Sequence, residues 1–269
     1  MEARDKMFAG PIPEIYDRYL VPLIFDPNAR ELAARVAALH PEHILETAAG
    51  TGVLTRAMAE ATPKASITAT DLNQTMLDRA MARDTTDGRV AWKQADALTL
   101  PVADATFDVV ACQFGVMFFP DKVACHREAR RSLRPGGSLV FNVWDEISKN
   151  GFPAAVSEAL AELYPDDPPR FMARIPHGYH EEARIRADLG AAGFSDVSTT
   201  PVDLVSRARS ALDVATGFCQ GTPVRPEIEA RGTPTLQDIT QHVAAFVERR
   251  FGSGPIEAPI RALIVQAKS

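Results

Sequence analysis

The sequence has little of several features that mark particular classes of protein. Among its 269 residues are only three cysteines, Cys112, Cys125 and Cys219, and none of them forms a CxxC pair. This odd, scattered set argues against a disulfide framework or a cysteine metal site, so we predict no metal and a reducing, cytoplasmic location. The charged N-terminus, MEARDKMFAG, has no apolar run of signal-peptide length.

Long hydrophobic runs and an excess of positive charge are also missing. No run approaches the roughly 20 apolar residues of a membrane span, so we expect none. The net charge is -6, which gives no electrostatic reason to bind nucleic acid. The most basic stretch, residues 126–134, is typical of a solvated helix face. We therefore expect a small-molecule partner and no nucleic acid, and the sequence leaves the oligomeric state open.

What the sequence does contain is an alternation of short β-like runs with helical stretches, from residue 43 to about residue 145. Strands separated by helices of this length favour right-handed crossovers. We predict an α/β fold with a doubly wound, Rossmann-like, seven-stranded and mostly parallel sheet. Helices would cover both faces, and the fold would add an N-terminal helical segment and helical insertions toward the C-terminus.

The chain shows no repeat or low-complexity segment, so we predict a single domain over residues 1–269. Leu32, Val36 and Leu39 recur at helical spacing before the core. RPGG at residues 134–137 predicts a helix stop and a tight turn before the fifth strand. The predicted parts are an N-terminal helical lid (1–40), a cofactor-binding core (41–147), helical insertions (148–180 and 208–255) and the remaining sheet elements (181–207 and 256–269).

A glycine-rich turn follows the first predicted strand, in HILETAAGTGVLTRAM. Gly50 and Gly52 fit the dinucleotide pattern G-x-G-x-x-G, but Thr55 takes the third position. Glu46 precedes the turn, and its carboxylate would repel a pyrophosphate while suiting a positively charged ligand. Both features count against NAD or FAD.

Two further acids end the next two predicted strands, Asp71 in ITATD and Asp96 in WKQAD. A carboxylate at the second position can accept hydrogen bonds from both hydroxyls of a ribose. Taken singly, Asp71 is also explained as a helix N-cap, Asp96 as a turn acid and the glycines as a tight turn. The three acids at consecutive strand ends together favour a nucleoside with a cationic tail.

Four segments in order resemble the class I S-adenosylmethionine-dependent methyltransferases: ILETAAGTG, ITATDLNQTML, QADALTLPVADATFDVVACQFGVMFFPD and EARRSLRPGGSLVFNVW. The resemblance covers about residues 40 to 145 and is greatest to the small-molecule enzymes of ubiquinone and menaquinone biosynthesis. It implies an enzyme that transfers a methyl group from S-adenosylmethionine to a small, apolar or aromatic acceptor by in-line displacement, leaving S-adenosylhomocysteine.

The resemblance also implies which positions would hold the cofactor. The glycine turn would approach its methionine portion, Asp71 its ribose and Asp96 its adenine, while the residues after the fourth strand would lie near the reactive end. The cofactor-binding residues would be Tyr16, Glu46, Thr47, Ala48, Ala49, Gly50, Thr51, Gly52, Asp71, Leu72, Asn73, Met76, Ala95, Asp96, Ala97, Leu98, Gln113 and Phe114.

Residues for the acceptor are less marked. We predict His177 as a catalytic base, against the alternative of a solvated loop histidine. The absence of a [DN]PPY or Pro-Cys motif argues against nucleic-acid methylation. Three alternatives stay open: a non-catalytic S-adenosylmethionine-binding module, an aminopropyl-type transferase and, more remotely, a nicotinamide oxidoreductase. The predicted substrate-binding residues, some equally explained as core, are Tyr19, Met117, Phe118, Trp144 and Tyr179.

Overall fold

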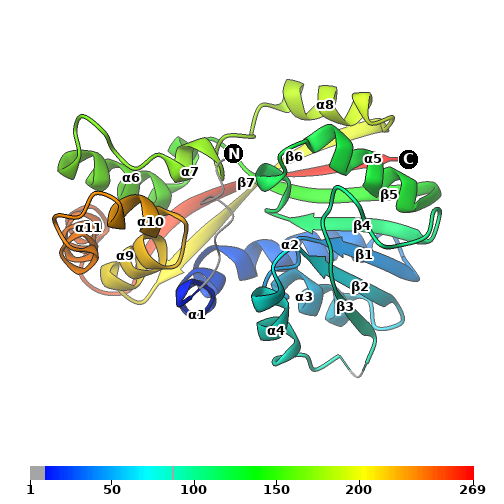
Figure 1. Ribbon diagram of the computed structural model, residues 1–269, viewed down its shortest axis with the longest axis horizontal. Helices are drawn as coiled ribbons and strands as arrows, with labels where there is room; N and C mark the ends of the chain where they lie inside the picture. Colours follow the sequence, from blue (N-terminus) through cyan, green and yellow to red (C-terminus); the bar gives the residue numbers. More distant parts are fainter. Residues whose placement is uncertain (1–9, 87) are drawn as a thin grey trace. The chain divides into compact units, whose positions relative to one another are not determined.

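The structure is a computed structural model that describes residues 10–86 and 88–269 (Figure 1). The part of the predicted N-terminal lid before residue 10 lies outside the described residues. The chain divides into two compact units. Unit 1 runs from the start of the described chain to Pro27 and includes Trp144–Gly178 and Asp203–Arg261, whereas unit 2 contains Asn28–Val143, Tyr179–Val202 and Ala262–Ser269.

The strands form one seven-stranded sheet in the order β3-β2-β1-β4-β5-β7-β6. The pairs β1–β2, β2–β3, β1–β4 and β4–β5 are all parallel. This arrangement confirms the predicted doubly wound, mostly parallel sheet. The strands are β1 (His43–Thr47), β2 (Ser66–Asp71), β3 (Val90–Gln94), β4 (Phe107–Gln113), β5 (Leu133–Trp144), β6 (Ser195–Ala208) and β7 (Ile256–Lys268).

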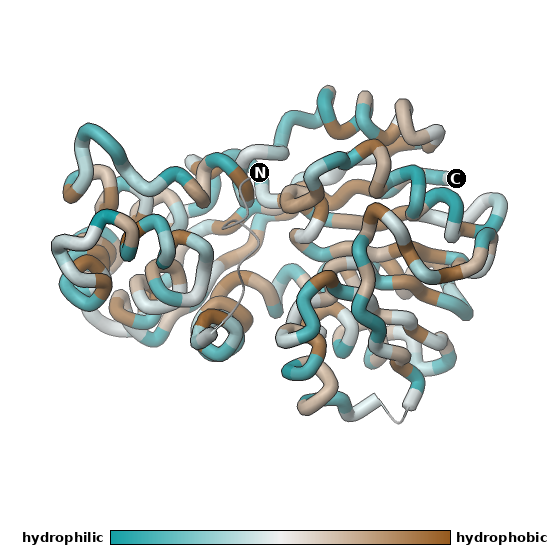
Figure 2. Tube along the Cα trace, in the orientation of Figure 1, coloured by the Kyte–Doolittle hydropathy of each residue, from teal (hydrophilic) through white to brown (hydrophobic). Residues whose placement is uncertain are grey.

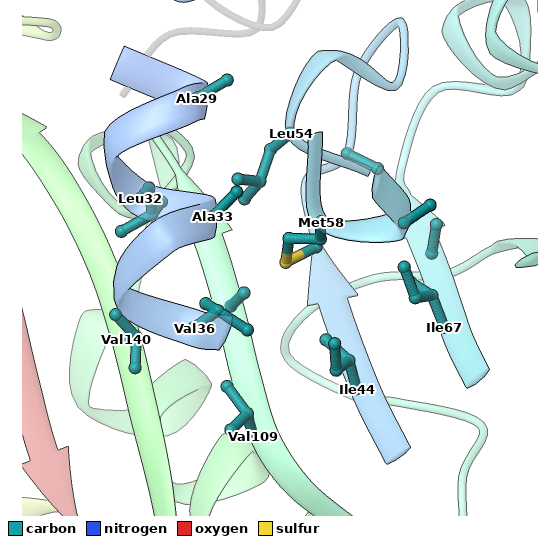
Figure 3. Close-up of a cluster of buried hydrophobic side chains, with 14 of the residues drawn as sticks. Ala29, Leu32, Ala33, Val36, Ile44, Leu54, Met58, Ile67, Val109 and Val140 are labelled. Carbon is teal, nitrogen blue, oxygen red and sulfur yellow. The ribbon is translucent and has the colours of Figure 1, made fainter. Parts of the chain in front are cut away.

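One face of the sheet in unit 2 is covered by α2 (Asp26–Ala37) and α3 (Val53–Ala61). Figure 3 shows Leu32 and Val36 of α2 packing toward the strands, as their helical spacing predicts. Met58 of α3 lies beside Ile44 of β1 in the same cluster. All four side chains are fully buried, so this face forms a continuous hydrophobic core.

The opposite face of the sheet carries α5 (Lys122–Ser132). His126 of α5 stacks on Phe141 of β5, with ring centroids 5.5 Å apart. Phe141 follows Val140, a member of the cluster on the first face, and neighbouring side chains of a strand point to opposite faces. Helices therefore cover both faces, as predicted. Unit 2 also contains α4 (Gln74–Met81), η3 (Val116–Phe118) and α8 (Glu182–Ala191). Figure 2 shows that hydrophilic and hydrophobic residues alternate along α8.

Unit 1 is mainly helical. Its longest helix, α11 (Leu236–Phe251), begins with a capping box in which the Thr235 side chain accepts from the Asp238 amide, and Gly252 caps its C-terminal end. Gly217 brings α9 against η2, since a β-carbon there would lie 3.0 Å from Leu20. The helices are α1 (Ile12–Ile15), the π-helix η2 (Tyr16–Phe25), η4 (Ile147–Lys149), α6 (Gly151–Leu163), α7 (Phe171–Arg174), α9 (Ala211–Gln220), α10 (Val224–Glu229) and α11 (Leu236–Phe251).

The structure differs from the sequence prediction at RPGG. Helix α5 does end at Ser132, but β5 begins at once at Leu133 and includes residues 134–137. The register with β4 shifts there, so that the strand bulges, and Gly136 has φ +79°. The glycines thus serve a bulge at the start of the strand and not a turn before it.

Candidate functional site

Polar side chains form a row across the carboxyl ends of four neighbouring strands. Glu46 on β1 pairs with one residue on each neighbouring strand, and each of these lies two positions before a polar residue. The polar residues are Asp71 on β2 and Gln113 on β4. Because side chains alternate between faces, these three share one face. Asn142 on β5 lies opposite Gln113 and completes the row. The strand order reverses between β1 and β4, which is where doubly wound sheets bind ligands.

The loop after β1, residues 48–52, has an unusual backbone. Ala48, Gly50 and Gly52 have positive φ angles of 55°, 57° and 76°. Such a conformation costs an L-residue roughly 1–2 kcal/mol, so the surroundings must hold Ala48 in place. The loop is fastened to β2 by the Gly50 amide, which donates to Oδ2 of Asp71 at 2.8 Å.

The two glycines of the loop have different surroundings. A β-carbon at Gly52 would lie 2.7 Å from the Trp92 ring and 3.0 Å from Arg56, so Gly52 allows close packing of protein side chains. Of the described residues, only the tip of Met76, at 3.7 Å, would come within 4 Å of a β-carbon at Gly50. Gly50 is therefore the position where the backbone can approach a ligand.

Glu46 is a buried carboxyl below this loop, with 1% of its surface exposed. The Thr55 hydroxyl of α3 donates to its Oε2 at 2.5 Å. Burial raises the pKa of Glu46 to about 8, against the opposing effects of Thr55 and the nearby positive charge of Arg56. The carboxyl is thus poised to be charged or neutral according to what binds beside it.

Asp71 is held by two backbone amides. Its Oδ2 accepts from Gly50, and its Oδ1 accepts from Asn73 at 2.8 Å. Burial raises the pKa of Asp71, and these two hydrogen bonds oppose the shift. The N-cap of α4 is Asn73, whose side chain accepts from the Thr75 amide at 3.1 Å. Asp71 is therefore not the helix cap, and each oxygen keeps a second lone pair for a ligand.

The segment that follows β3 is more exposed than the loop after β1. Asp96 is exposed, and its Oδ1 accepts from the Leu98 amide at 2.9 Å in a side-chain turn. Leu72 exposes 49% of its surface, an unusual degree for a large apolar side chain, whereas Met76 is buried. The Ala95 amide donates to the Asp71 carbonyl at 2.9 Å and ties the end of β3 to that of β2.

The turn after β4, residues 113–115, also has a strained backbone. Phe114 has φ +51°, and its amide donates both to Oδ1 of Asn142 at 3.0 Å and to the Asn142 carbonyl at 3.2 Å. A β-carbon at Gly115 would lie 2.5 Å from that of Ala48 and 2.7 Å from Sγ of Cys112. The turn is therefore pressed against the loop after β1, and only glycine allows this contact.

Comparison with known proteins identifies the family. A model described as a methyltransferase domain matches residues 44–137. The demethylmenaquinone methyltransferase of Thermus thermophilus is 30% identical over 167 residues, which cover 58% of this chain and 75% of that protein. The chain belongs to the class I S-adenosylmethionine-dependent methyltransferases. This result confirms the predicted family and S-adenosylmethionine as its cofactor.

Other curated relatives match a smaller part of their own length. The demethylmenaquinone methyltransferase of Deinococcus radiodurans is 36% identical over 52% of this chain and 59% of that protein. The ubiquinone/menaquinone biosynthesis C-methyltransferase UbiE of Paracoccus denitrificans is 41% identical over 37% of this chain and 41% of that protein. The chain thus spans about half the length of these two relatives.

Solved structures share the fold at low sequence identity. The YcgJ protein of Bacillus subtilis covers 90% of this chain and 98% of its own, with a TM-score of 0.57 and 18% identity. Phosphoethanolamine N-methyltransferase 2 of Haemonchus contortus, solved with S-adenosyl-L-methionine, covers 98% of this chain and 58% of its own, with a TM-score of 0.61 and 15% identity. These likenesses support the fold alone.

The residues at the strand ends fit the cofactor of this family. Gly50 leaves backbone open to a ligand, and Asp71 offers two acceptor oxygens for ribose hydroxyls. The hydroxyl of Thr51 is buried with no hydrogen-bond partner among the described residues, so a polar ligand on the loop would satisfy it. The buried carboxyl of Glu46 suits the ammonium group of the methionine portion.

Several predicted residues have structural contacts of their own. Thr47 bonds to the side chain of Cys112 on the other face of β1. Met117 is buried in η3, and Phe118 beside it is half-buried. Tyr179 is buried in unit 2, and its hydroxyl donates to Asp188 at 2.8 Å. Their assignments to cofactor or acceptor stay predictions.

The predicted aromatic residues of unit 1 form a row. Tyr16 stacks on Phe25 at 4.8 Å between centroids, Phe25 lies 6.1 Å from Trp144, and Trp144 lies 6.1 Å from His177. Tyr19 packs separately, beside Gly217 of α9 and the guanidinium of Arg18. Nδ1 of His177 lies 2.8 Å from the Asp145 carbonyl. A carbonyl only accepts, so Nδ1 carries the hydrogen.

Three residues of the site were missed at the sequence level: Thr55, Gly115 and Asn142. Thr55 replaces the third glycine of the dinucleotide pattern, and its hydroxyl donates to Glu46. Asn142 comes from the strand beside Gln113, and nothing in its sequence surroundings marks it. Among the residues that the structure describes, no group of three histidines, cysteines or acids is arranged to hold a metal.

Proposed function

We propose that this protein transfers a methyl group from S-adenosylmethionine to a small aromatic or apolar acceptor. The observation that carries the proposal is the open Gly50 backbone, which donates to Asp71 near the buried carboxyl of Glu46, within a chain of this family. Two acids beside a glycine loop favour a cationic nucleoside over a pyrophosphate, which would be repelled.

In this proposal the protein acts mainly by holding the reactants in line. The sulfonium of the cofactor supplies an already activated methyl group. Asp71 would bind the ribose hydroxyls, Glu46 would face the ammonium group, and residues 113–115 would lie near the methyl group. Holding both reactants in position contributes up to roughly 7–11 kcal/mol in ideal cases, without a protein nucleophile.

The proposed acceptor class draws on two observations. Relatives that match this chain include demethylmenaquinone and ubiquinone/menaquinone methyltransferases, which are named for quinones. Unit 1 carries the row of Tyr16, Phe25 and Trp144, and aromatic side chains of this kind pack favourably with aromatic molecules. The net charge of -6 favours such an acceptor over nucleic acid.

His177 is the residue that we propose as a general base, if the acceptor must lose a proton. Its Nδ1 donates to a backbone carbonyl, so the neutral ring carries its lone pair on Nε2. This is a tautomer that can accept a proton, and such catalysis contributes about 10²–10⁴-fold.

The proposal also includes a setting for the protein. All three cysteines are buried free thiols, which supports a reducing compartment such as the cytoplasm. No helix in residues 10–86 and 88–269 has the length and apolar character needed to cross a bilayer.

Calorimetry tests the cofactor. The wild-type protein should bind S-adenosylmethionine and not NAD, and Asp71→Ala should lose roughly 1.5–3 kcal/mol of binding free energy with the charged carboxylate. Asp78→Ala removes an exposed acid from the neighbouring helix α4 and should bind normally. Tighter binding of NAD than of S-adenosylmethionine would overturn the proposal.

A transfer assay with radiolabelled S-adenosylmethionine tests the acceptor. A short-chain demethylmenaquinol should be methylated, and phosphoethanolamine should not. Methylation of phosphoethanolamine alone would contradict the apolar acceptor class. Binding of the cofactor without transfer to any acceptor in a broad screen would instead favour a non-catalytic binding module.

A further inference from the structure

The hydrogen bond between Thr55 and Glu46 is a feature of the glycine loop that the proposed function does not yet use. Thr55 occupies the third position of the G-x-G-x-x-G pattern, where a dinucleotide-binding loop has glycine for close packing. Its side chain is fully buried, and its hydroxyl donates to Glu46 at 2.5 Å. A third glycine would leave this carboxyl without the donor.

The surroundings of Glu46 make that donor important. The charged groups near it are Arg56 from α3 and Asp71 from β2, and the Cys112 thiol of β4 interacts with it only electrostatically, from the other face of the sheet. Asp71 opposes a negative charge on Glu46, whereas Arg56 favours one. Burial is the largest effect, and it raises the pKa of Glu46 to about 8. A hydroxyl that donates to the carboxyl therefore lowers the cost of charging it.

We propose that Thr55 is a positioning residue that sets the preference of the loop for a cationic ligand, because its hydroxyl orients the Glu46 carboxyl and stabilises the negative charge that an ammonium group faces. The inference rests on the proposed function, which places the methionine portion of the cofactor on this loop. Thr55 itself need not touch the ligand. Its effect would be confined to ligands that carry the ammonium group.

Two ligands separate this effect from general binding. S-Adenosylhomocysteine carries the ammonium group, whereas 5′-methylthioadenosine has the same nucleoside without it. Thr55→Val keeps the shape of the side chain and removes the hydroxyl. It should weaken S-adenosylhomocysteine about tenfold, the effect of a hydrogen bond to a charged group, and leave 5′-methylthioadenosine unchanged. Thr55→Ser restores the hydroxyl and should recover the affinity.

A second buried threonine provides the matched control. Thr70 of β2 also bonds to Glu46, but its hydroxyl donates to the backbone carbonyl, at 2.9 Å. Thr70→Val thus removes a buried hydrogen bond to the same residue without touching the carboxyl. It should leave the ratio of the two affinities as in the wild type, whatever it does to the melting temperature.

The pH dependence gives a readout that a merely structural role would not move. In Thr55→Val the carboxyl needs a higher pH to ionise, so the affinity for S-adenosylhomocysteine should recover as the pH rises from 7 to 9. The wild type should gain less over that range. Affinity for 5′-methylthioadenosine should not follow pH in either protein.

Each result of the calorimetry is decisive. Equal weakening of both ligands by Thr55→Val, or of neither, would overturn the inference, as would a loss that Thr55→Ser fails to restore. Failure of the wild type to bind either ligand would count against the proposed function instead. If Thr55→Val does not fold, Thr55→Ala provides the same comparison, because it also removes the hydroxyl that donates to Glu46 and should reduce only the binding of S-adenosylhomocysteine.

Discussion

The loop after β1, residues 48–52, and the turn after β4, residues 113–115, both have a strained backbone, but different side chains hold them in place. Each contains one non-glycine residue with a positive φ, Ala48 at 55° and Phe114 at 51°. The loop is fastened by the carboxylate of Asp71, whereas the turn is fastened by the neutral amide of Asn142. The acids of the row therefore lie on the side of β1 and β2, and the neutral amides on the side of β4 and β5.

This difference has a physical consequence for the proposed reaction. A sulfonium loses its positive charge as the methyl group leaves, so a carboxylate close to it would stabilise the ground state more than the transition state. Negative charge is useful where the cofactor is bound, at the ribose and the ammonium group. Neutral groups are preferable where the methyl group is transferred. Four experiments test this difference between the two segments.

The largest effect expected is on the pH dependence of stability. The folded protein raises the pKa of Glu46 to about 8 from 4.5, so it binds this proton more tightly than the unfolded chain does. The resulting stability is complete below about pH 4.5 and is lost as the pH rises through 8. Glu46→Gln should remove a slope of about 1.4 kcal/mol per pH unit from the free energy of unfolding between these values.

Denaturant titrations at pH 5, 6, 7 and 8 measure that slope. Glu60→Gln, at an exposed position of α3, should leave it unchanged. Identical slopes in the wild type and Glu46→Gln would show that the carboxyl does not titrate there. The turn after β4 should add nothing in this range, since burial raises the pKa of the Cys112 thiol to about 12.

The next largest effect is on stability, and it comes from the contact between Gly115 and Ala48. Gly115→Ala would place a β-carbon 2.5 Å from that of Ala48, and overpacking of this kind costs about 1–3 kcal/mol. Ala48→Gly removes one of the two crowded atoms and relieves its own backbone strain, so the double variant should recover part of the loss. Thermal melts of the four proteins test this, and additive effects would show that the segments are not coupled.

A negative charge added on the side of β4 and β5 should have a smaller effect on binding. Asn142→Asp keeps an acceptor for the Phe114 amide and adds a carboxylate near the proposed reactive end. Binding of S-adenosylmethionine should tighten relative to S-adenosylhomocysteine by roughly 1 kcal/mol, because only the former carries the sulfonium charge. The rate of transfer should fall. An unchanged ratio of the two affinities would place the sulfonium away from β5.

The smallest effect concerns the unpartnered hydroxyl of Thr51. Thr51→Val replaces a buried group that lacks a hydrogen bond within the described residues, so the ligand-free protein should gain about 1 kcal/mol of stability. Binding of S-adenosylhomocysteine should weaken by a similar amount, since the ligand loses a donor. Melting temperatures with and without the ligand measure both. A loss of stability in the ligand-free protein would contradict the assignment.

Much of the fold was predictable because its signals are local. Leu32 and Val36 predicted α2 from their spacing. Glu46 and Asp71, near the ends of β1 and β2, predicted the carboxyl edge that carries the site. The bulge at residues 134–137 was wrongly predicted as a turn, because its conformation depends on pairing with β4. The division into a lid, a core and insertions stays a prediction.

The family, the order of the elements and the acids near the strand ends could all be inferred from the amino-acid sequence, since periodicity, turn residues and short motifs depend on neighbours along the chain. Three features came from three-dimensional packing: Gly50 has open space beside it while Gly52 packs against Trp92, Thr55 bonds to Glu46, and Asn142 holds Phe114. These are contacts between residues that the register of the sheet and the packing of α3 bring together. No local pattern encodes them, because each depends on the position of an atom from another element.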